Sequence, residues 1–433
     1  MIRNFITAPI KVVMAAAFCT AAAAAQPIVV IGTDNAMLDV AAVQAAVDHG
    51  GQVVLVGRFS FNRSSLKPDM ASYSRMVTVS KEVAISGKLD ERGEMPTITG
   101  GAIPFYVDAP GTPVAIRGLR FIRPKGAAVW VHAANGLMIE DCRIEGVEAS
   151  TEFGNYARQI HPLASAIFVG SNPAPPKPGQ EEQPENNFGE LSILDNDINV
   201  GGTAHDQALG ICVFGVGKSP EKKVNLYISG NKIRNITERA INVNQIGGQA
   251  QIERNVIVTG ALAAPSNGVQ PDVIHAVGSG SYLIAHNSIV SEWAAGAGIR
   301  VQGNAGSSQN GAIIVDNDLT MLASENTIFG ANSAGIEIRG LAQGNVVLNN
   351  RIRGRAGSGL AVIVQGLNAP ANNTFASNDL EGFHSSLAQV FVDAGVVNTL
   401  LIGRKGTVRN RGVGTVIVNK GTTASPWRQK AQN

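Results

Sequence analysis

The chain has 433 residues, of which 49 are glycine, 5% are aromatic and 16% are charged, and its formal net charge is +2 at pH 7. Few charges together with many small and apolar residues exclude a disordered chain and favour a protein built largely from buried strands. A nearly neutral charge argues against a general binder of nucleic acid or anionic membranes, which needs a basic surface.

The first 25 residues have the pattern of an export signal. Arg3 and Lys11 precede an apolar run over residues 12–25, and three alanines stand directly before Gln26. The run is short for a membrane span, and no later stretch is long enough for one. We therefore expect residues 1–25 to be removed and the mature protein to be periplasmic or secreted. A buried N-terminal helix is the alternative.

Residues 34–49 are the next recognisable element. Leu38, Val40, Val43 and Val47 stand among alanines at spacings that place them on one side of a helix. A strand follows at once, from residue 52 to residue 57. The pattern predicts a short N-terminal helix that caps a β structure, because an uncovered terminal strand would expose its edge to other chains.

A short repeat then extends to residue 380. It consists of an apolar residue, Asn three positions later, and a second apolar residue two positions further on. Its central residues are Leu119, Cys142, Asn196, Asn231, Asn255, Asn287, Asn317, Asn350 and Asn378. The smallest step between neighbouring copies is 23 residues, which indicates the length of a minimal coil.

Each repeat also contains a strand with apolar residues at every second position, such as Ile211 and Val213 or Ile299 and Val301. This period of two indicates a strand with one buried face. In this register Cys142 points inward and Cys212 outward, so we expect no disulfide between them.

Stacked coils of this kind bury a continuous core that no single coil could bury alone. The repeats resemble those of the pectate-lyase-like superfamily of right-handed parallel β-helix proteins, over roughly residues 52–419. The resemblance implies an all-β, right-handed single-stranded parallel β-helix, with Asn at the turn between two strands. We assign residues 26–420 to this domain and 421–433 to a C-terminal tail, and we expect the repeat to fade after Gly403.

The recurring asparagines are expected to form a ladder along the helix axis. Each side-chain amide would bond to the asparagine of the next coil, a net gain of about 0.5–1.5 kcal/mol per bond. Asn also tolerates the left-handed backbone that a tight turn needs, and we expect the ladder residues themselves to adopt it.

By the same resemblance, the outer face of the alternating strand carries substrate. One predicted outward column contains Trp130, Phe168, Cys212, Asn242, His275, Arg300, Glu337, Ala361 and Phe391. Its neighbour contains His132, Gly170, Phe214, Asn244, Val277, Gln302, Arg339, Ile363 and Asp393. Aromatic rings beside amides suit sugars. The predicted substrate-binding residues are Trp130, His132, Phe168, Phe214, Asn242 and Asn244. An ordinary sheet surface is the alternative interpretation.

Two long connections flank the strand of Phe168, one between Cys142 and Ile167 and the other over residues 171–189. They would wall a cleft over the N-terminal half, although the second could equally be a solvated insertion. The predicted catalytic residues are His161, His205, Asp206, His275 and Arg300, whose side chains suit proton transfer and charge neutralisation.

No cofactor is predicted. The sequence shows no zinc-ligand spacing. Calcium stays an open alternative, but no cluster of Asp residues supports a calcium site. The function indicated is that of an exported carbohydrate-active protein, a lyase-like enzyme on an acidic polysaccharide. The alternative is a non-catalytic glycan-binding or surface β-helix protein, so catalysis itself stays open. The expected partner is a polysaccharide or oligosaccharide and not nucleic acid, and we expect a monomer.

Overall fold

A computed structural model describes residues 26–62, 75–149, 163–170, 186–201, 207–217, 219–260, 272–293, 296–304, 309–322, 334–354, 360–365, 370–381, 389–403 and 407–418. All structural statements below concern these residues. The predicted export signal (1–25) and tail (421–433) lie outside them and stay predictions. No helix in these ranges is both long enough and apolar enough to span a membrane.

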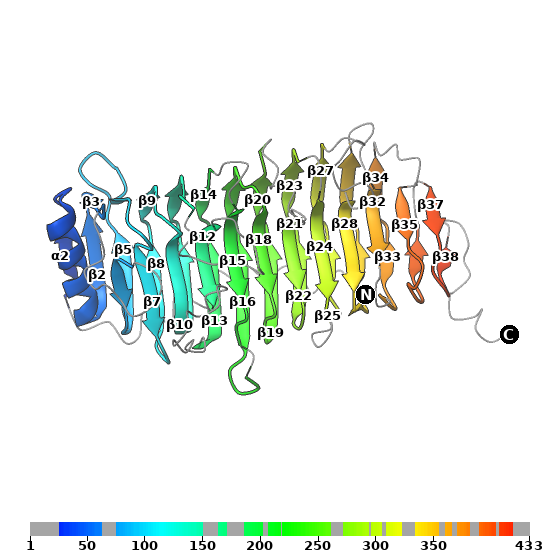
Figure 1. Cartoon of the computed structure of the whole chain (residues 1–433), viewed down its shortest axis with the longest axis horizontal. Coiled ribbons are helices and arrows are strands. Elements are labelled where there is room, and N and C mark those ends of the chain that lie inside the picture. Colours follow the sequence, from blue (N-terminus) through cyan, green and yellow to red (C-terminus); the bar gives the residue numbers. More distant parts are fainter. Residues whose placement is uncertain are drawn as a thin grey trace, which may run out of the picture.

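Parallel strands stacked in three columns make up the molecule (Figure 1). The first column contains β4 (Val77–Val79), β7 (Phe105–Ala109), β10 (Ala127–Glu140), β12 (Leu163–Gly170), β15 (Gln207–Phe214), β18 (Arg239–Asn244), β21 (Asp272–Val277), β24 (Ala297–Gly303), β28 (Ala334–Gly340), β32 (Leu360–Gln365), β35 (Val390–Val392) and β37 (Val408–Asn410).

The second column contains β1 (Ile28–Ile31), β2 (Gly51–Val56), β5 (Val83–Gly87), β8 (Val114–Arg117), the second half of β10, β13 (Asn186–Leu194), β16 (Val224–Ser229), β19 (Gly248–Glu253), β22 (Ser281–Ala285), β26 (Ile313–Val315), β30 (Val346–Leu348), β33 (Thr374–Ala376), β36 (Leu400–Ile402) and β38 (Val416–Val418).

The third column contains β3 (Arg58–Ser60), β6 (Thr97–Thr99), β9 (Arg120–Ile122), β11 (Arg143–Glu145), β14 (Asp197–Asn199), β17 (Lys232–Arg234), β20 (Val256–Val258), β23 (Ser288–Ser291), β27 (Asp318–Met321), β31 (Arg351–Gly354) and β34 (Asp379–Glu381). The short strands β25 (Gln309–Asn310) and β29 (Ala342–Gln343) form a separate pair. The chain visits the second, third and first columns in turn, which confirms the predicted right-handed parallel β-helix.

The interior of the coil is filled by the alternating apolar residues. Ile211 of β15 lies opposite Ile241 of β18, Val213 lies opposite Val243, and all four side chains are fully buried. The same register continues in β24 and β28, where Ile299 lies opposite Ile336. Because neighbouring coils bury the same positions, every added coil removes more apolar surface from water. Each Å² of that surface stabilises the fold by about 25 cal/mol.

The asparagine ladder is confirmed. From Asn196 to Asn378, the Nδ2 of each asparagine donates to the Oδ1 of the next at 2.9–3.0 Å. At the N-terminal end, Cys142 occupies the same position, and its backbone N–H donates to Asn196 Oδ1 at 2.9 Å. A second ladder of two rungs, Asn345 and Asn373, was not predicted, because two copies show no period.

The backbone expectation for these asparagines is wrong. The left-handed residue is the one before each rung, for example Asp195 (φ 54°), Arg254 (φ 55°) and Asp316 (φ 54°). The preceding residue reverses the chain, which leaves the asparagine side chain free to lie along the helix axis and reach the next coil.

The N-terminal cap is confirmed as α2 (Ala36–His49), which lies at one end of the solenoid (Figure 1). Asn35 begins it, with its side chain accepting from the Met37 backbone N–H at 3.0 Å. Val40, Val43 and Val47 are buried against the first coils, whereas Leu38, also predicted for this face, is 58% exposed.

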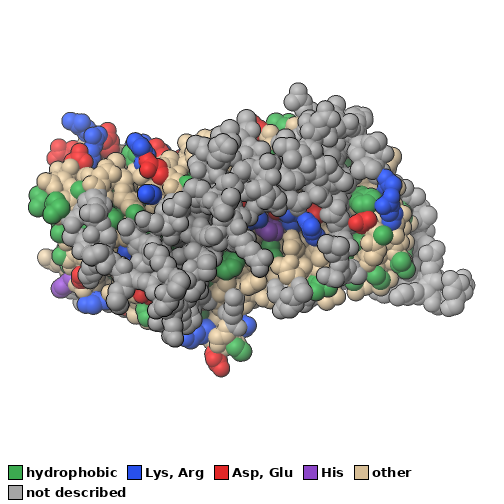
Figure 2. Space-filling model, in the orientation of Figure 1, with side chains coloured by type: hydrophobic (Ala, Val, Ile, Leu, Met, Phe, Trp, Pro, Cys, Tyr) green, Lys and Arg blue, Asp and Glu red, His purple; other side chains and the backbone are tan. Residues whose placement is uncertain are grey.

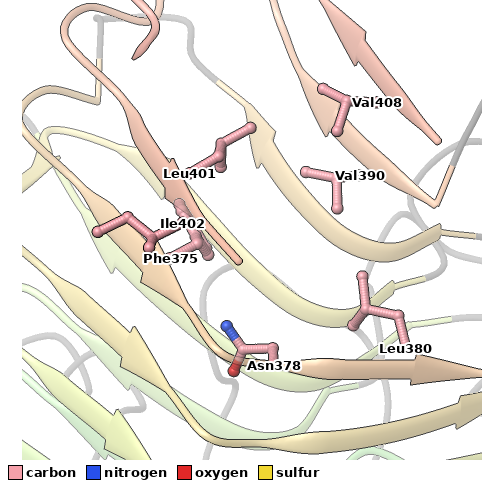
Figure 3. Close-up of a pocket in the computed structure, with 7 residues that line it drawn as sticks. All are labelled: Phe375, Asn378, Leu380, Val390, Leu401, Ile402 and Val408. Atoms are coloured by element: carbon pink, nitrogen blue, oxygen red, sulfur yellow. The ribbon is translucent and has the colours of Figure 1, made fainter. Parts of the chain in front are cut away.

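At the C-terminal end, β37 and β38 continue two columns to Val418. The prediction that the repeat fades after Gly403 is therefore wrong. The interior there is less well filled, and a small apolar hollow remains (Figure 3). It is lined by Phe375, Asn378, Leu380, Val390, Leu401, Ile402 and Val408. Short valines occupy places that isoleucine fills in earlier coils, which leaves this space.

The two cysteines point as predicted. Cys142 belongs to the main core inside the coil, and Cys212 belongs to a second apolar cluster outside it. Both are buried and unpaired, and burial raises the pKa of each thiol to about 12.

Candidate functional site

The outward side of the first column, called the outer face below, carries the predicted stripe. Strand pairing aligns Trp130, Phe168, Cys212, Asn242, His275, Arg300 and Glu337 in one file. One coil is corrected: Ile363, not Ala361, lies opposite Glu337, and Gln365, not Ile363, lies opposite Arg339. The register pairs Val362 with Ile336 and Val364 with Ile338, two residues later in β32 than predicted.

The aromatic residues of the stripe pack against one another. Trp130 contacts Tyr106 and Phe168 edge to face, with ring centroids 5.0 and 6.0 Å apart, and its Nε1 donates to Gly170 O at 2.9 Å. Trp130 and Phe168 are both fully buried, and Phe214 packs at the edge of their cluster. In this arrangement the rings hold the outer face together, and their sugar-stacking role stays a prediction.

The other predicted binding residues have protein partners. His132 Nδ1 lies 3.3 Å from Asp108 Oδ1, and this hydrogen bond lowers the pKa of Asp108. Asn242 is fully buried and its Nδ2 donates to Cys212 Sγ at 3.3 Å. Asn244, two residues further on, is half-buried.

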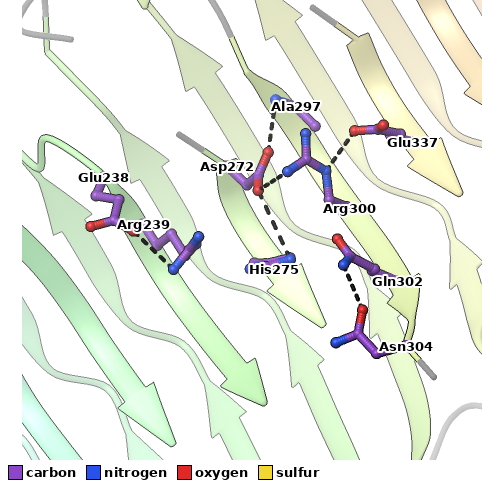
Figure 4. A network of polar contacts seen from close by, with 9 residues as sticks. All are labelled: Glu238, Arg239, Asp272, His275, Ala297, Arg300, Gln302, Asn304 and Glu337. Atoms are coloured by element: carbon purple, nitrogen blue, oxygen red, sulfur yellow. Dashed lines mark hydrogen bonds and ion pairs between the residues drawn. The ribbon is translucent and has the colours of Figure 1, made fainter. Parts of the chain in front are cut away.

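The middle coils carry a buried set of charged side chains, called the central cluster: Glu238, Arg239, Asp272, His275, Arg300 and Glu337 (Figure 4). Arg300 connects three coils, because its Nη1 donates to Asp272 Oδ2 at 2.6 Å and its Nε donates to Glu337 Oε2 at 2.5 Å. Glu238 and Arg239 form a second ion pair at 2.8 Å.

His275 lies on β21, directly opposite Arg300 of β24, with its Nε2 4.0 Å from Asp272 Oδ2. Neither ring nitrogen makes a hydrogen bond of good geometry within the described chain. Burial and the positive charges of Arg239, Arg300 and Arg339 hold the pKa of His275 well below its usual value, against a smaller opposing effect of Gln302. The imidazole is therefore neutral near pH 7.

Two carboxyl groups of the cluster respond in the opposite direction. Burial raises the pKa of Asp272 to about 6, although Arg300 and Arg239 oppose the increase. Burial also raises the pKa of Glu238. A neutral imidazole beside a carboxyl group that exchanges its proton near pH 6 can accept and donate protons in one site.

The cluster is almost closed to solvent, with His275 6% and Arg300 3% exposed. Figure 2 shows a histidine together with arginine or lysine side chains on the visible face, over the region that β21 and β24 occupy in Figure 1. Their strand neighbours Ile274, Ala276, Ile299 and Val301 belong to the core inside the coil, so His275 and Arg300 lie on the outward side of the first column.

Sequence reasoning found part of this cluster. His275 and Arg300 were predicted as catalytic residues and are brought together on consecutive coils. Glu337 stood in the predicted column without a role, and Asp272 was missed, although it lies on the same strand three residues before His275. His161, His205 and Asp206 lie outside the described residues, so their roles stay predictions.

A pH titration tests the state of His275. In the unfolded chain a histidine binds a proton below about pH 6.5, whereas the folded chain keeps His275 neutral, so acid favours unfolding. Relative to a His275→Gln variant, wild-type stability should be constant above pH 7 and fall by about 1.4 kcal/mol per pH unit below pH 6.5.

Urea unfolding from pH 5 to pH 8 measures this difference, and His286→Gln, at an exposed turn, controls for loss of a histidine. A wild-type-to-variant difference that does not change with pH would show that the pKa of His275 is the same in the folded and unfolded chains.

Within the described ranges, no three His, Cys, Asp or Glu side chains are grouped to hold a metal ion.

Neither a protein-family model nor a curated protein sequence matches the chain. Among solved structures, the mannuronan C-5 epimerase AlgE4 A-module of Azotobacter vinelandii is 14% identical, with a TM-score of 0.41 over 89% of this chain and 95% of that one. PfbA, a surface adhesin of Streptococcus pneumoniae, is 11% identical, with a TM-score of 0.41 over 91% and 94%. DFA-IIIase from Arthrobacter chlorophenolicus A6 without its lid is 12% identical, with a TM-score of 0.40 over 93% and 98%. At these values the fold assignment rests on the chain's own strand pairings.

Proposed function

We propose that the protein is a periplasmic or secreted enzyme that cleaves an acidic polysaccharide by elimination, with the central cluster as its reaction centre. One observation carries the proposal: a neutral imidazole and a carboxyl group of raised pKa lie together among three arginines on the outer face. Strongly shifted pKa values of this kind concentrate at functional sites.

Elimination removes the proton from the carbon next to a uronate carboxylate. The electron pair of that bond forms a double bond, the bond to the glycosidic oxygen breaks, and the leaving oxygen takes up a proton. In this proposal, the bound uronate carboxylate offsets the arginine charges that lower the pKa of His275, so His275 accepts the first proton. Asp272, protonated in part near pH 6, supplies the second. Arg239, Arg300 and Arg339 stabilise the anion formed between these steps.

The charge of the cluster agrees with this role. When Asp272 holds a proton, the two arginines of the cluster and the neighbouring Arg339 stand against the carboxylates of Glu238 and Glu337, so the site is positive. An extended glycan can follow the outer face, because successive coils present side chains at a spacing of about 4.8 Å. Since His275 is 6% exposed, the saccharide reaches it only after a local rearrangement.

The test is an assay of the purified protein on polygalacturonate, alginate and glycosaminoglycans, read as the ultraviolet absorbance of the unsaturated product. We expect product from at least one acidic glycan and a loss of about 100-fold or more in kcat for His275→Gln. The exposed variant His286→Gln should keep full activity. Absence of product across the panel, or equal activity of His275→Gln, would refute the lyase proposal.

A non-catalytic glycan-binding protein is the second candidate. It is favoured by the fact that Arg300 already bonds to two carboxylates of the protein, so the charges of the cluster satisfy one another. This candidate predicts glycan binding without release of unsaturated or shortened products in the same assay.

A further inference from the structure

The outer face has a second concentration of positive charge at its C-terminal end. Phe391 lies three coils beyond Arg300 in the same file, a distance of about 14 Å along the axis. The guanidinium carbons of Arg409 and Arg411 lie 6.0 and 5.9 Å from the centroid of its ring. Two cations from the last coil therefore approach one aromatic side chain.

The strand register explains this arrangement. Arg409 of β37 lies directly opposite Phe391 of β35, so both side chains point outward from the first column. The Arg411 backbone N–H donates to Val392 O at 2.8 Å, which places Arg411 beside the same strand. Phe391 is 9% exposed, whereas Arg411 is exposed and Arg409 is half-buried. The ring forms the floor and the guanidinium groups form the rim.

These two arginines differ from most others in the fold. Arg120, Arg123, Arg143, Arg234, Arg254, Arg300 and Arg353 all form ion pairs with carboxylates. Arg409 and Arg411 form none with any described residue. Two neighbouring cations without a carboxylate repel each other, and an anionic ligand would remove this repulsion.

The sequence around them is also basic. From residue 389 onward the basic residues are Arg404, Lys405, Arg409, Arg411, Lys420, Arg428 and Lys430, and the only acidic residue is Asp393. Residues 26–388 contain 26 basic and 32 acidic residues. The positive charge of the chain is therefore concentrated toward one end, which favours a negatively charged partner there.

We propose that Arg409 and Arg411 bind carboxylate groups of the acidic glycan, on a segment that extends from the central cluster toward the C-terminal end. The inference rests on the proposed function and adds where the glycan lies on the protein and which charge the glycan carries. Guanidinium groups bind carboxylates through paired hydrogen bonds, and an aromatic ring accepts the apolar face of a sugar.

The test uses the full-length mature protein and measures binding of polygalacturonate and alginate, with dextran as the neutral glycan. The variant Arg409→Gln/Arg411→Gln removes two charges from the site. Its control, Arg254→Gln/Arg351→Gln, removes two charges from exposed arginines away from the site, one in the turn after β19 and one in the third column. A third protein, Arg409→Lys/Arg411→Lys, keeps the charge, and thermal unfolding checks that each variant folds.

We expect the glutamine pair to weaken binding of the better acidic glycan about tenfold or more, with little change for the control and an intermediate loss for the lysine pair. Equal losses in site and control variants would refute the inference, as would equally tight binding of single-stranded DNA, which indicates a general polyanion surface. Unchanged glycan binding by the glutamine pair would refute the inference about Arg409 and Arg411. The proposed function would still stand if the protein forms the unsaturated product. If the wild-type protein binds no acidic glycan, both proposals fail.

Discussion

Replacing Arg300 by methionine should destabilise the protein by about 3–5 kcal/mol at pH 8. The guanidinium group bonds to Asp272 and Glu337, both with 0% exposed side chains, and its removal leaves two buried carboxylates without their counter-charge. Asp272 already binds a proton near pH 6, and loss of Arg300 raises its pKa further. Protonation then relieves the buried charge, so the loss should be smaller at pH 5 than at pH 8.

Urea unfolding followed by circular dichroism at both pH values measures this effect. Arg353→Met is the matched control, because Arg353 bonds to Asp318 at 2.6 Å in a half-exposed pair whose loss costs under about 1 kcal/mol. Adding Asp272→Asn and Glu337→Gln to Arg300→Met should recover much of the stability, since neither of the two carboxylates that Arg300 neutralised is then left as a buried charge. A loss no larger than that of Arg353→Met would show that the central cluster is hydrated.

Replacing Asn287 by alanine should cost about 3–5 kcal/mol, because this rung takes part in four hydrogen bonds. Its Nδ2 donates to Ile252 O and to Asn317 Oδ1, both at 2.9 Å. Its Oδ1 accepts from the backbone N–H and from Nδ2 of Asn255, at 3.1 and 3.0 Å. Alanine removes these bonds and leaves buried polar groups of both neighbouring coils unsatisfied.

Position along the ladder supplies the comparison. Asn378 is the last rung and is less buried, so Asn378→Ala should cost clearly less than Asn287→Ala. Asn199 lies outside the ladder and accepts an exposed hydrogen bond from Asn235, so Asn199→Ala should lower the free energy of unfolding by less than about 1 kcal/mol. Equal losses at all three positions, measured by urea unfolding, would contradict a ladder that stabilises the coil stack.

Much of the fold could be predicted because its information is local and repeated. An apolar residue at every second position can only point into the coil, and an asparagine that recurs at one turn must meet its copies when coils stack. The ladder from Asn196 to Asn378 and the interior pairs such as Ile299 and Ile336 follow from these two rules. The cap formed by α2 follows from a different local pattern, the helical spacing of its valines.

The candidate site was predictable only in part. The file containing His275, Arg300 and Glu337 follows from the interior alternation, but the partners of these side chains do not. Asp272 reaches Arg300 through side-chain geometry between two coils, and no pattern along the chain encodes that contact. The shift in β32 shows the same limit, because the length of the turn before a strand decides which of its residues join the outward file.

By itself, the sequence determined the all-β solenoid, its three-strand coil and the direction of nearly every interior side chain, since each depends on a short period repeated along the chain. The tertiary structure decided the burial of Trp130 and Phe168, the left-handed residue before each rung, and the ionic connections of Arg300. These features depend on which groups from separate coils come within bonding distance, and the energy of a buried charge is set by those neighbours and not by its own position in the repeat.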